Sequence, residues 1–575
     1  MPSLKIFSRL ISIVVTFCFL YTLGLETSLA VQDLPQASLG SYNGDPFADL
    51  VVGVPHENLL DTPGSYNNGM IHVIHGFPQG LGPQDNETWD QDMDFSQDRI
   101  ERIDQFGRSL ASGDFDGDGY YDVAVGVPYE TINDGLEEIR RAGAVHIIYG
   151  SSAGGLTAAG NQFLHQDSPD VAGIDEADDN FGYSLAVGNF NGDEYDDLAI
   201  GVPGEDFEYS PTLFNGGSVN VIYGSANGLD PVGVLPDKAW NQDSYDDDGP
   251  EIIDGVEGYE EFGYALTVGN FDGDAYDDLA IGAPGESSST KSKMGVVHIL
   301  YGTQDGLKAE GNKQLEQFDW GGSAESETDD QFGKALAAGD FERDGFDDLA
   351  VGVPREDITP PSGSPIMDAG AVNVYTGSNT GLREFNVEII YQDGEMIAEQ
   401  GEKSDNFGHT LAAVDFTGTG LDNLVVGVPF KDFWEPYMEN AGALYVLSRA
   451  WVGGFVSDDP HFFHQGREVI PGDLGQNHEF GYALAPGDYN GDGKEDLAIG
   501  VPGDNCNVYE DGSVVVIYSD TWDGLGAVSP QYWCQGGSLK DQGEIDDGFG
   551  FSLAALPSSG SLPFRSYLPS ILRDE

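Results

Sequence analysis

Hydrophobic and polar positions alternate along this chain in short blocks, and the 3.6-residue period of an amphipathic helix is nearly absent. Apolar, β-branched runs such as Val123–Val127 and Ala144–Tyr149 are bounded by Gly, Asp and Asn. Runs of this length and composition predict β-strands, and their polar boundaries predict turns. The runs come in groups, each of which is consistent with a unit of four short strands.

These units repeat along nearly the whole chain, and the clearest marker is an acidic nonapeptide, Asp114–Asp122 in its fullest form. Successive copies begin 73, 75, 81, 70, 75 and 73 residues apart. The seven copies begin at Ser41, Asp114, Asn189, Asn270, Asp340, Asp415 and Asp488. Four-stranded units that repeat radially form β-propellers. The sequence therefore predicts an all-β fold, a seven-bladed β-propeller.

The two ends of the array predict how the ring closes. A Phe-Gly pair precedes every nonapeptide except the first, and a further pair, Phe549-Gly550, is followed by a strand-like run without an acidic loop. We therefore expect the C-terminal strand to complete the first blade. The predicted organisation is a signal peptide at residues 1–30, the propeller at 31–556 and a C-terminal tail at 557–575.

The N-terminal segment has the pattern of a secretory signal. Lys5 and Arg9 precede an apolar run, and Ser28-Leu-Ala30 offers a small-residue cleavage site. The alternative is an uncleaved membrane anchor, although the apolar run is shorter than a full bilayer span. We expect a secreted or cell-surface protein without a transmembrane span in the mature chain.

Charge narrows the range of partners. The chain has 24 Lys and Arg against 99 Asp and Glu, a formal net charge of −75. Binding to nucleic acid is not expected, because the phosphate backbone requires basic patches, and anionic lipid is disfavoured for the same reason. So many carboxylates repel one another unless cations neutralise them.

The nonapeptides supply the chemistry for such cations. Their pattern is D-x-[D/N]-x-D-G-x-x-D, with oxygen donors at positions 1, 3, 5 and 9 and a backbone carbonyl at position 7. A curled, Gly-containing loop of this kind suits Ca²⁺, which takes six to eight oxygen ligands. Zinc is disfavoured because thiol and imidazole groups are missing from the pattern, and magnesium prefers fewer protein ligands.

The copies differ in how many ligands they keep. The sixth has Asp415, Thr417, Thr419 and Asn423, so we expect no ion there. We expect about five calcium sites, with copies two, four, five and seven the best. The candidate ligands, including the position 7 carbonyls, are Asn43, Asp45 and Asp49; Asp114, Asp116, Asp118, Tyr120 and Asp122; Asn189, Asn191, Asp193, Tyr195 and Asp197; Asn270, Asp272, Asp274, Tyr276 and Asp278; Asp340, Glu342, Asp344, Phe346 and Asp348; and Asp488, Asn490, Asp492, Lys494 and Asp496. The alternative is that the loops are ordinary Asx-rich turns.

The combined pattern resembles a known repeat. Phe-Gly, the nonapeptide and a following Gly-Val/Ala-Pro, as in Gly126-Val-Pro128, look like the FG-GAP repeat of integrin alpha-chain propellers. The resemblance covers residues 37 to 556 and implies calcium on the loops of one face, with ligand contacts on the opposite face. The propeller also resembles the C-terminal part of the phospholipase D that cleaves glycosylphosphatidylinositol anchors.

The sequence departs from both families. We find no inserted adhesion domain, leg domains or transmembrane helix after the propeller, and no catalytic domain before it. Metalloprotease, nucleophile-elbow and Walker patterns are also missing, so an enzyme is not expected. We expect a monomeric adhesion or ligand-binding module for an extracellular protein or glycan. The alternatives are a hydrolase or lyase that uses the channel, an accessory propeller like that of the phospholipase, and a structural surface protein.

Two cysteines follow the signal segment, Cys506 and Cys534. In an oxidising compartment they form a disulfide, and otherwise they remain a pair of free, buried thiols. The sequence leaves both alternatives open.

Overall fold

The computed structural model describes residues 41–59, 67–92, 100, 102–133, 138–207, 214–244, 252, 255–317, 326–360, 363–392, 397, 401–434, 437–449, 455–456, 462–467, 470–521, 524–525, 530–536, 539 and 541–556. The chain divides into residues 1–38 and 39–575, and every described residue lies in the second unit. The predicted signal peptide and C-terminal tail lie outside the described residues. Within the described ranges there is no helix, and so none that could cross a membrane.

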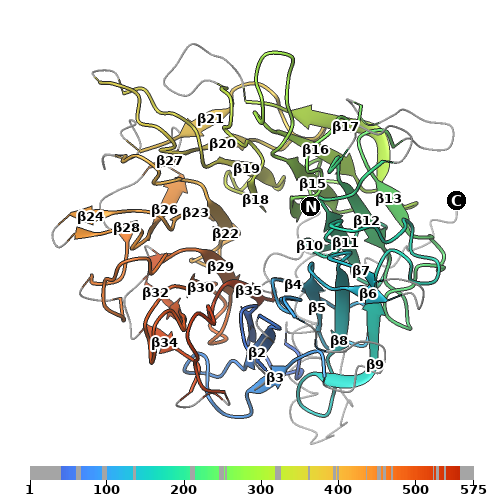
Figure 1. Ribbon diagram of the computed structural model, residues 1–575, viewed down its shortest axis with the longest axis horizontal. Helices are drawn as coiled ribbons and strands as arrows, with labels where there is room; N and C mark the ends of the chain where they lie inside the picture. The colour runs from blue at the N-terminus through green and yellow to red at the C-terminus, as the bar shows by residue number, and fades with distance from the viewer. Residues whose placement is uncertain are drawn as a thin grey trace, which may run out of the picture. The chain divides into compact units, whose positions relative to one another are not determined.

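The second unit contains seven antiparallel sheets, which are the blades of a β-propeller (Figure 1). From the inside outward, blade 1 is β35 (Ser552–Ala555), β1 (Leu50–Val54), β2 (Met70–Ile74) and β3 (Glu87–Trp89). Blade 2 is β4 (Ser109–Gly113), β5 (Asp122–Val127), β8 (Ala144–Tyr149) and β9 (Thr157–Leu164). Blade 3 is β10 (Ser184–Gly188), β11 (Asp197–Val202), β12 (Ser218–Ile222) and β13 (Lys238–Trp240).

The remaining blades have the same order. Blade 4 is β14 (Ala265–Gly269), β15 (Asp278–Ala283), β16 (Val296–Tyr301) and β17 (Lys308–Leu315). Blade 5 is β18 (Ala335–Gly339), β19 (Asp348–Val353), β20 (Ala371–Tyr375) and β21 (Glu388–Ile390). Blade 6 is β22 (Thr410–Val414), β23 (Asn423–Val428), β26 (Ala443–Arg449) and β27 (Phe455–Val456), with β28 (Phe462–Phe463) also paired to β26. Blade 7 is β29 (Ala483–Gly487), β30 (Asp496–Val501), β31 (Ser513–Ile517) and β34 (Gln531–Trp533).

Three two-stranded hairpins project from this frame. They are β6 (Ile132–Asn133) with β7 (Glu138–Ile139), β24 (Phe433–Trp434) with β25 (Tyr437–Met438), and β32 (Ser519–Thr521) with β33 (Gly524–Leu525). Each hairpin lies in a long connection between two strands of its blade. These connections make the repeat longer than four short strands joined by tight turns.

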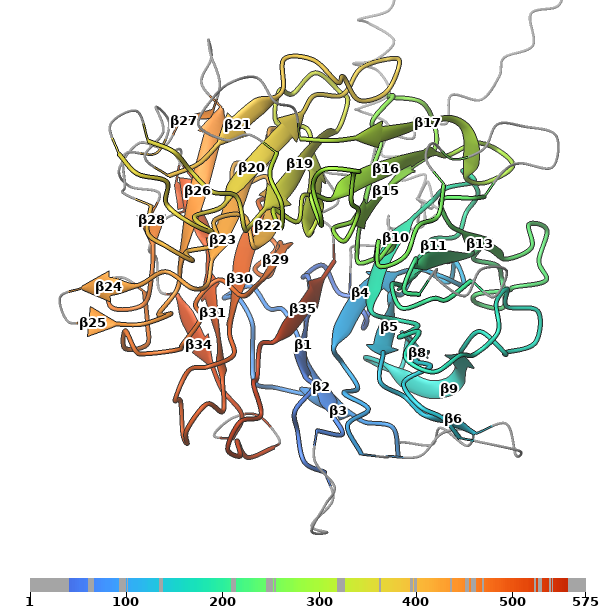
Figure 2. The same ribbon diagram turned by 45° about the horizontal axis from the view of Figure 1, so that its top comes forward.

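The ring closes as the sequence predicts. Strand β35 pairs antiparallel with β1, with Leu50 opposite Ala555 and Gly53 opposite Ser552. The innermost strands contact one another in the order β4, β10, β14, β18, β22, β29, β35 and again β4, and Figure 2 shows β35 beside β1 and β4. Closure by a strand from the far end of the chain leaves the ring without an open seam.

The hydrophobic core is divided among the seven interfaces between neighbouring blades. Each interface has its own buried cluster; the one between blades 1 and 2 includes Val51, Val123 and Phe106. The Phe of every Phe-Gly pair is fully buried in such a cluster, which explains why that position recurs. At Gly126 a Cβ atom would lie 2.2 Å from the carbonyl oxygen of Gly182 in the next blade, so the blades approach through glycine.

The two cysteines are bonded to each other, which decides the alternative that the sequence left open. Cys506 follows β30 and Cys534 follows β34, with their Cα atoms 6.3 Å apart. The bond therefore joins the two connections at the outer part of blade 7.

Candidate metal centres

In blades 2 to 7 the acidic nonapeptides connect the first and second strands, and in blade 1 the nonapeptide leads into the second strand, β1, so they all lie at the same end of the strands. In blade 2 the loop runs from the end of β4 to Asp122, which is the first residue of β5. Hydrogen bonding within the loop is dense. The backbone N–H of Asp118 donates to Asp114 Oδ1 and Asp116 Oδ1, both at 3.1 Å, and Gly119 N–H donates to Asp114 Oδ2 at 3.1 Å.

Position 9 holds each loop to its blade. In blade 2, Asp122 Oδ2 accepts the N–H of Phe115 and Oδ1 accepts that of Gly150, both at 2.9 Å. The aspartates at the same position in four other blades make the same pair of backbone contacts: Asp49, Asp197, Asp278 and Asp348. Burial raises the pKa of Asp122 to about 9 although these two N–H groups lower it. Asp122 is therefore both a predicted ligand and a residue that holds the loop to the blade by hydrogen bonds.

Blade 2 has the most compact donor set. Ligand oxygens of Asp114, Asp116 and Asp122 all lie within 4.8 Å of one another. Burial raises the pKa of Asp114 to about 7, and the neighbouring Asp196 and Asp116 carboxylates contribute to the rise. Such a group holds a proton near neutral pH unless a cation takes its place. The donors are all oxygens, which fits Ca²⁺.

Blades 3 and 4 add an independent indication that the loops suit a cation. The position 1 side chains, Asn189 and Asn270, donate through Nδ2 to the backbone carbonyls of Asp193 and Asp274, at 2.8 and 3.1 Å. Their Oδ1 atoms are buried and have no hydrogen-bond partner. A buried acceptor without a donor is costly, and a bound cation would satisfy it.

Three loops place a cationic side chain beside a predicted ligand, among them that of blade 7, where Lys494 Nζ lies 3.7 Å from Asp492 Oδ2; the other two are those of blades 1 and 5. In blade 1, His75 Nδ1 lies 3.2 Å from Asp49 Oδ1. Burial lowers the pKa of His75, but contacts with Asp49 and Glu87 outweigh it and raise the pKa to about 10. In blade 5, Glu342 pairs with Arg449 of blade 6 at 2.6 Å. In these loops the protein already supplies part of the positive charge.

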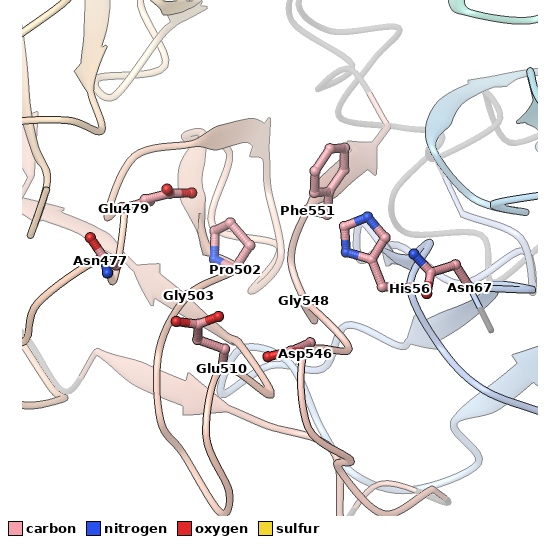
Figure 3. Close-up of a pocket in the computed structure, with 10 residues that line it drawn as sticks. All are labelled: His56, Asn67, Asn477, Glu479, Pro502, Gly503, Glu510, Asp546, Gly548 and Phe551. Carbon is pink, nitrogen blue, oxygen red and sulfur yellow. The ribbon is translucent and has the colours of Figure 1, made fainter. Parts of the chain in front are cut away.

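The opposite end of the strands carries the Phe-Gly and Gly-Val-Pro segments, and this face is hollowed between blades 7 and 1. A cavity of about 540 Å³ is lined there by residues of both blades (Figure 3). Glu479, Glu510 and Asp546 place three carboxylates on its wall, while His56 and Phe551 lie on the other side with ring centroids 5.5 Å apart. Burial raises the pKa of Glu479 to about 7, with a contribution from Glu510, and burial lowers that of His56.

The same face carries aromatic and basic side chains one residue after each Phe-Gly pair. The Arg108 guanidinium carbon lies 5.0 Å from the ring centroid of Phe551 and 5.6 Å from that of Tyr183. The ring centroids of Tyr482 and Phe551 lie 5.0 Å apart, with the rings tilted at 47° to each other. Arg108 therefore bridges aromatic side chains of separate blades.

A comparison with protein-family models identifies the repeat. The FG-GAP repeat model matches residues 106–148, 181–222, 262–300, 332–375 and 480–517. The chain contains five FG-GAP repeats. The matched segments lie in blades 2, 3, 4, 5 and 7, and the structure adds blades 1 and 6 with the same strand order.

Curated relatives match part of this chain. Phosphatidylinositol-glycan-specific phospholipase D of Bos taurus is 35% identical over 181 residues, which is 30% of this chain and 19% of that protein. Integrin alpha-PS2 of Drosophila melanogaster is 30% identical over 262 residues, 44% of this chain and 16% of that protein. The chain thus spans less than a fifth of the length of these relatives.

Among solved structures, a periplasmic gluconolactonase of Pseudomonas aeruginosa covers 89% of this chain and 99% of its own, at 11% identity and a TM-score of 0.40. A likeness at this level gives no information about a shared activity.

The structure also shows a role that the sequence analysis missed, at position 8 of the FG-GAP loops. Around the ring, the backbone N–H at position 8 of one loop donates to the carbonyl at position 1 of the preceding loop; Asp196 to Asp114, at 3.1 Å, is one example. Five of the position 8 residues are acids, and their carboxylates accept a hydrogen bond from the backbone N–H of the same position 1 residue. They are Asp196, Asp277, Asp347, Asp422 and Glu495. The signal was in the sequence, because each is the first of two polar residues, as in Asp277-Asp278.

The position 7 residues, predicted as carbonyl ligands, have a second function. A Cβ atom on Gly117 would lie 2.7 Å from the ring of Tyr195 in the next loop, and the same relation holds between Gly192 and Tyr276. Each aromatic side chain thus covers the glycine of the preceding loop, so neighbouring loops support one another.

Proposed function

We propose that this FG-GAP protein is a calcium-binding propeller that acts outside the cell as an adhesion or ligand-binding module. The observation that carries the proposal is the set of oxygen donors in the loops of blades 2, 3 and 4. The loop of blade 2 holds three carboxylates close together, and the loops of blades 3 and 4 each contain a buried amide oxygen that lacks a partner. The cation would supply positive charge that rigidifies the loop and cancels repulsion, without taking part in a reaction.

In blade 2 the calcium ligands would be Asp114, Asp116, Asp118, Asp122 and the carbonyl of Tyr120. We expect weak sites, with dissociation constants of about 10⁻⁴ to 10⁻³ M, as is typical of extracellular modules. Such sites are filled outside cells and empty in the cytosol, which supports an extracellular location. The relatedness to integrin alpha chains and to a phospholipase D that acts on glycan-linked lipid supports the same location.

For the ligand we propose the face opposite the loops, over the cavity between blades 7 and 1. Glu479, Glu510 and Asp546 give this cavity negative charge, and His56 with Phe551 gives it an aromatic wall. A protein ligand that presents a Lys or Arg side chain fits this combination. The proposal assigns no catalysed reaction to the chain.

The experiment is an array of extracellular-matrix proteins and glycans, probed with the purified protein in calcium and in EDTA. We expect calcium-dependent binding to at least one protein that carries exposed basic residues. The variant Glu479→Gln with Glu510→Gln should lower the affinity at least tenfold. The matched control, Asp305→Asn with Glu310→Gln, removes the same charge from an exposed edge of blade 4 and should bind as the parent does.

The outcomes separate the parts of the proposal. Binding that the cavity variant retains would place the ligand elsewhere on the propeller. Absence of binding to every array member in calcium would overturn the adhesion role.

A further inference from the structure

A second set of acids recurs at the blade interfaces, at the end of the strands opposite the FG-GAP loops. One acid lies two residues after the Pro of Gly-Val/Ala-Pro, and the other lies two residues before Phe-Gly. Nine of these ten side chains are buried, and Glu205 is partly buried. The pairs, in the order of the blades, are Glu57 with Asp547, Glu130 with Asp104, Glu205 with Asp179, Glu286 with Glu260, and Glu356 with Asp330.

The clearest of these acid clusters is the pocket formed by Glu57, Glu544 and Asp547 between blades 7 and 1. Carboxylate oxygens of Glu57, Asp547 and Glu544 all lie within 4.8 Å of one another. Gln535 Nε2 donates to Glu57 Oε2 at 2.7 Å, and the backbone N–H of Glu544 donates to Asp547 Oδ2. Asp547 is fully buried, yet its Oδ1 atom has no hydrogen-bond partner. Glu544 is exposed, so the pocket is open to ions from solvent.

A second compact pocket lies between blades 3 and 4. Carboxylate oxygens of Glu257, Glu260 and Glu286 again lie within 4.8 Å of one another. Gln242 Nε2 donates to Glu286 Oε2 at 3.0 Å, while Gln242 Oε1 is buried without a partner. Gln535 Oε1 in the first pocket is likewise buried and unpartnered. Both pockets thus hold more acceptors than their surroundings can satisfy.

Blades 6 and 7 show what such a pocket requires, because there the chain itself supplies donors. In blade 6 the acid after Gly-Val-Pro is replaced by Lys431, whose Nζ donates to Asp405 Oδ2 at 2.7 Å, with both side chains buried. In blade 7 the acid before Phe-Gly is replaced by His478, whose Nδ1 lies 3.2 Å from Asp504 Oδ1 and 2.9 Å from Gln465 Oε1. A positive or proton-bearing group therefore occupies the position in these two blades.

The pKa shifts of these carboxylates agree with this geometry. Burial and the neighbouring Asp547 carboxylate raise the pKa of Glu57, and burial with Glu286 raises that of Glu260. In blade 6 burial raises the pKa of Asp405 only to about 6, because Lys431 opposes the effect. Two ionised carboxylates this close repel one another unless a positive charge lies between them.

We propose that the pockets Glu57–Glu544–Asp547 and Glu257–Glu260–Glu286 each bind a divalent cation, and that they form a second class of metal site distinct from the FG-GAP loops. The donors are carboxylate oxygens alone, which selects a hard cation such as Ca²⁺. Strand β1 separates the two classes, since Asp49 precedes it and Glu57 follows it. A cation here ties the Gly-Val-Pro turn of one blade to the segment that enters its innermost strand.

The test introduces into each pocket the lysine that blade 6 has at the equivalent position, Lys431. Glu57→Lys and Glu286→Lys are made separately in the full chain, and bound calcium is counted by equilibrium dialysis against ⁴⁵Ca. Each variant should bind one calcium ion fewer than the parent. Glu57→Gln and Glu286→Gln, which keep the side-chain shape, should lose the same ion if a lysine variant does not fold.

Two further variants complete the design. Lys431→Glu rebuilds an acidic pocket in blade 6 and should gain one calcium ion. Glu310→Lys makes the same charge change at an exposed position of β17 and should leave the count unchanged. If the Glu57 and Glu286 variants bind as many ions as the parent, the acid pairs share a proton instead and the proposal is wrong. The FG-GAP loops are intact in all these variants, so this result is independent of the function proposed for them.

Discussion

Blades 2 and 6 have the same strands and the same loop, but they satisfy the oxygen atoms of that loop differently. In blade 2 the loop carries four carboxylates and leaves its donor oxygens clustered. In blade 6, Thr417 replaces an acid, and its hydroxyl donates to Asp415 Oδ1 at 2.9 Å and lies 2.7 Å from the Thr419 hydroxyl. Asn423 at position 9 donates to Ser448 Oγ at 2.7 Å.

The interface pockets repeat this difference. Blade 6 has Lys431 opposite Asp405, where blade 2 has Glu130 and Asp104. Blade 6 therefore contains hydrogen-bond donors in its loop and a positive charge, that of Lys431, at the other end of its strands, whereas most other blades contain acceptors. A buried acceptor requires a donor or a cation. Under the two proposals above, blades that lack an internal donor at these positions take a cation from solvent.

Removing calcium should have the largest effect, because it acts on every acceptor-rich loop at once. A site that is filled only in the folded state adds about 2.7 kcal/mol at a calcium concentration 100 times its dissociation constant, so four loops add roughly 10 kcal/mol. Thermal melts in EDTA and in about 10 mM calcium measure this difference. Equal midpoints in the two buffers would show that the loops are ordinary Asx-rich turns and would remove the contrast with blade 6.

The second prediction concerns pH in the absence of calcium. The folded pKa values of Asp114, Asp122 and Asp278 are raised, to about 7, 9 and 8, mainly by burial. Unfolded carboxyls titrate near about 4, so the folded chain binds more protons between pH 4 and 9. Their contribution is complete below about pH 4 and is lost as the pH rises through the folded values.

The melting temperature in EDTA should therefore fall as the pH is raised from about 5 to 9, by an amount equivalent to several kcal/mol. Calcium should abolish this fall, because the cation replaces the proton. A melting temperature in EDTA that rises over the same range would contradict the assignment of raised pKa values to these loops.

Exchanging single loops should have an intermediate effect. Asp114→Ala with Asp118→Ala should remove one calcium ion from blade 2 and about 2–3 kcal/mol of calcium-dependent stability. Thr417→Asp with Thr419→Asp should add an ion to blade 6. Isothermal titration calorimetry measures both stoichiometries. An unchanged count in the blade 6 variant would mean that more than the loop ligands distinguishes the two blades.

The smallest effect is expected at the position 8 acids. Asp277 Oδ2 accepts the backbone N–H of Asn189 at 2.8 Å across the interface between blades 4 and 3. Asp277→Ala should cost about 1–2 kcal/mol in urea unfolding, since it leaves that N–H without its acceptor. Asp277→Asn, which keeps an oxygen acceptor of the same shape, serves as the comparison. Equal losses in the two variants would show that the side-chain acceptor adds nothing to the backbone bond.

Much of the fold could be predicted from repetition. The expected strand at Ala144–Tyr149 is β8 with the same bounds, the run Val123–Val127 lies in β5, and the closing strand after Phe549 is β35. These predictions succeed because a strand depends on local composition and a blade repeats its pattern. The loops lie where expected, but calcium binding by their residues remains a prediction.

The interface chemistry was not predictable, because it joins residues that are far apart in the sequence. Gln535 contacts Glu57 across almost the whole chain, and only closure of the ring brings them together. Gln535 and the acid after Gly-Val-Pro are each visible in the sequence, but their pairing is not.

The sequence by itself determined the number of blades, the strands and the position of each acidic loop, because turn residues and β-branched runs act locally and repeat. Tertiary structure alone decided that Cys506 bonds Cys534, that Glu342 pairs with Arg449, and that acids of separate segments meet in buried pockets. The physical reason is that burial and Coulomb interactions depend on distances in space. These distances are set only when the last strand closes the ring.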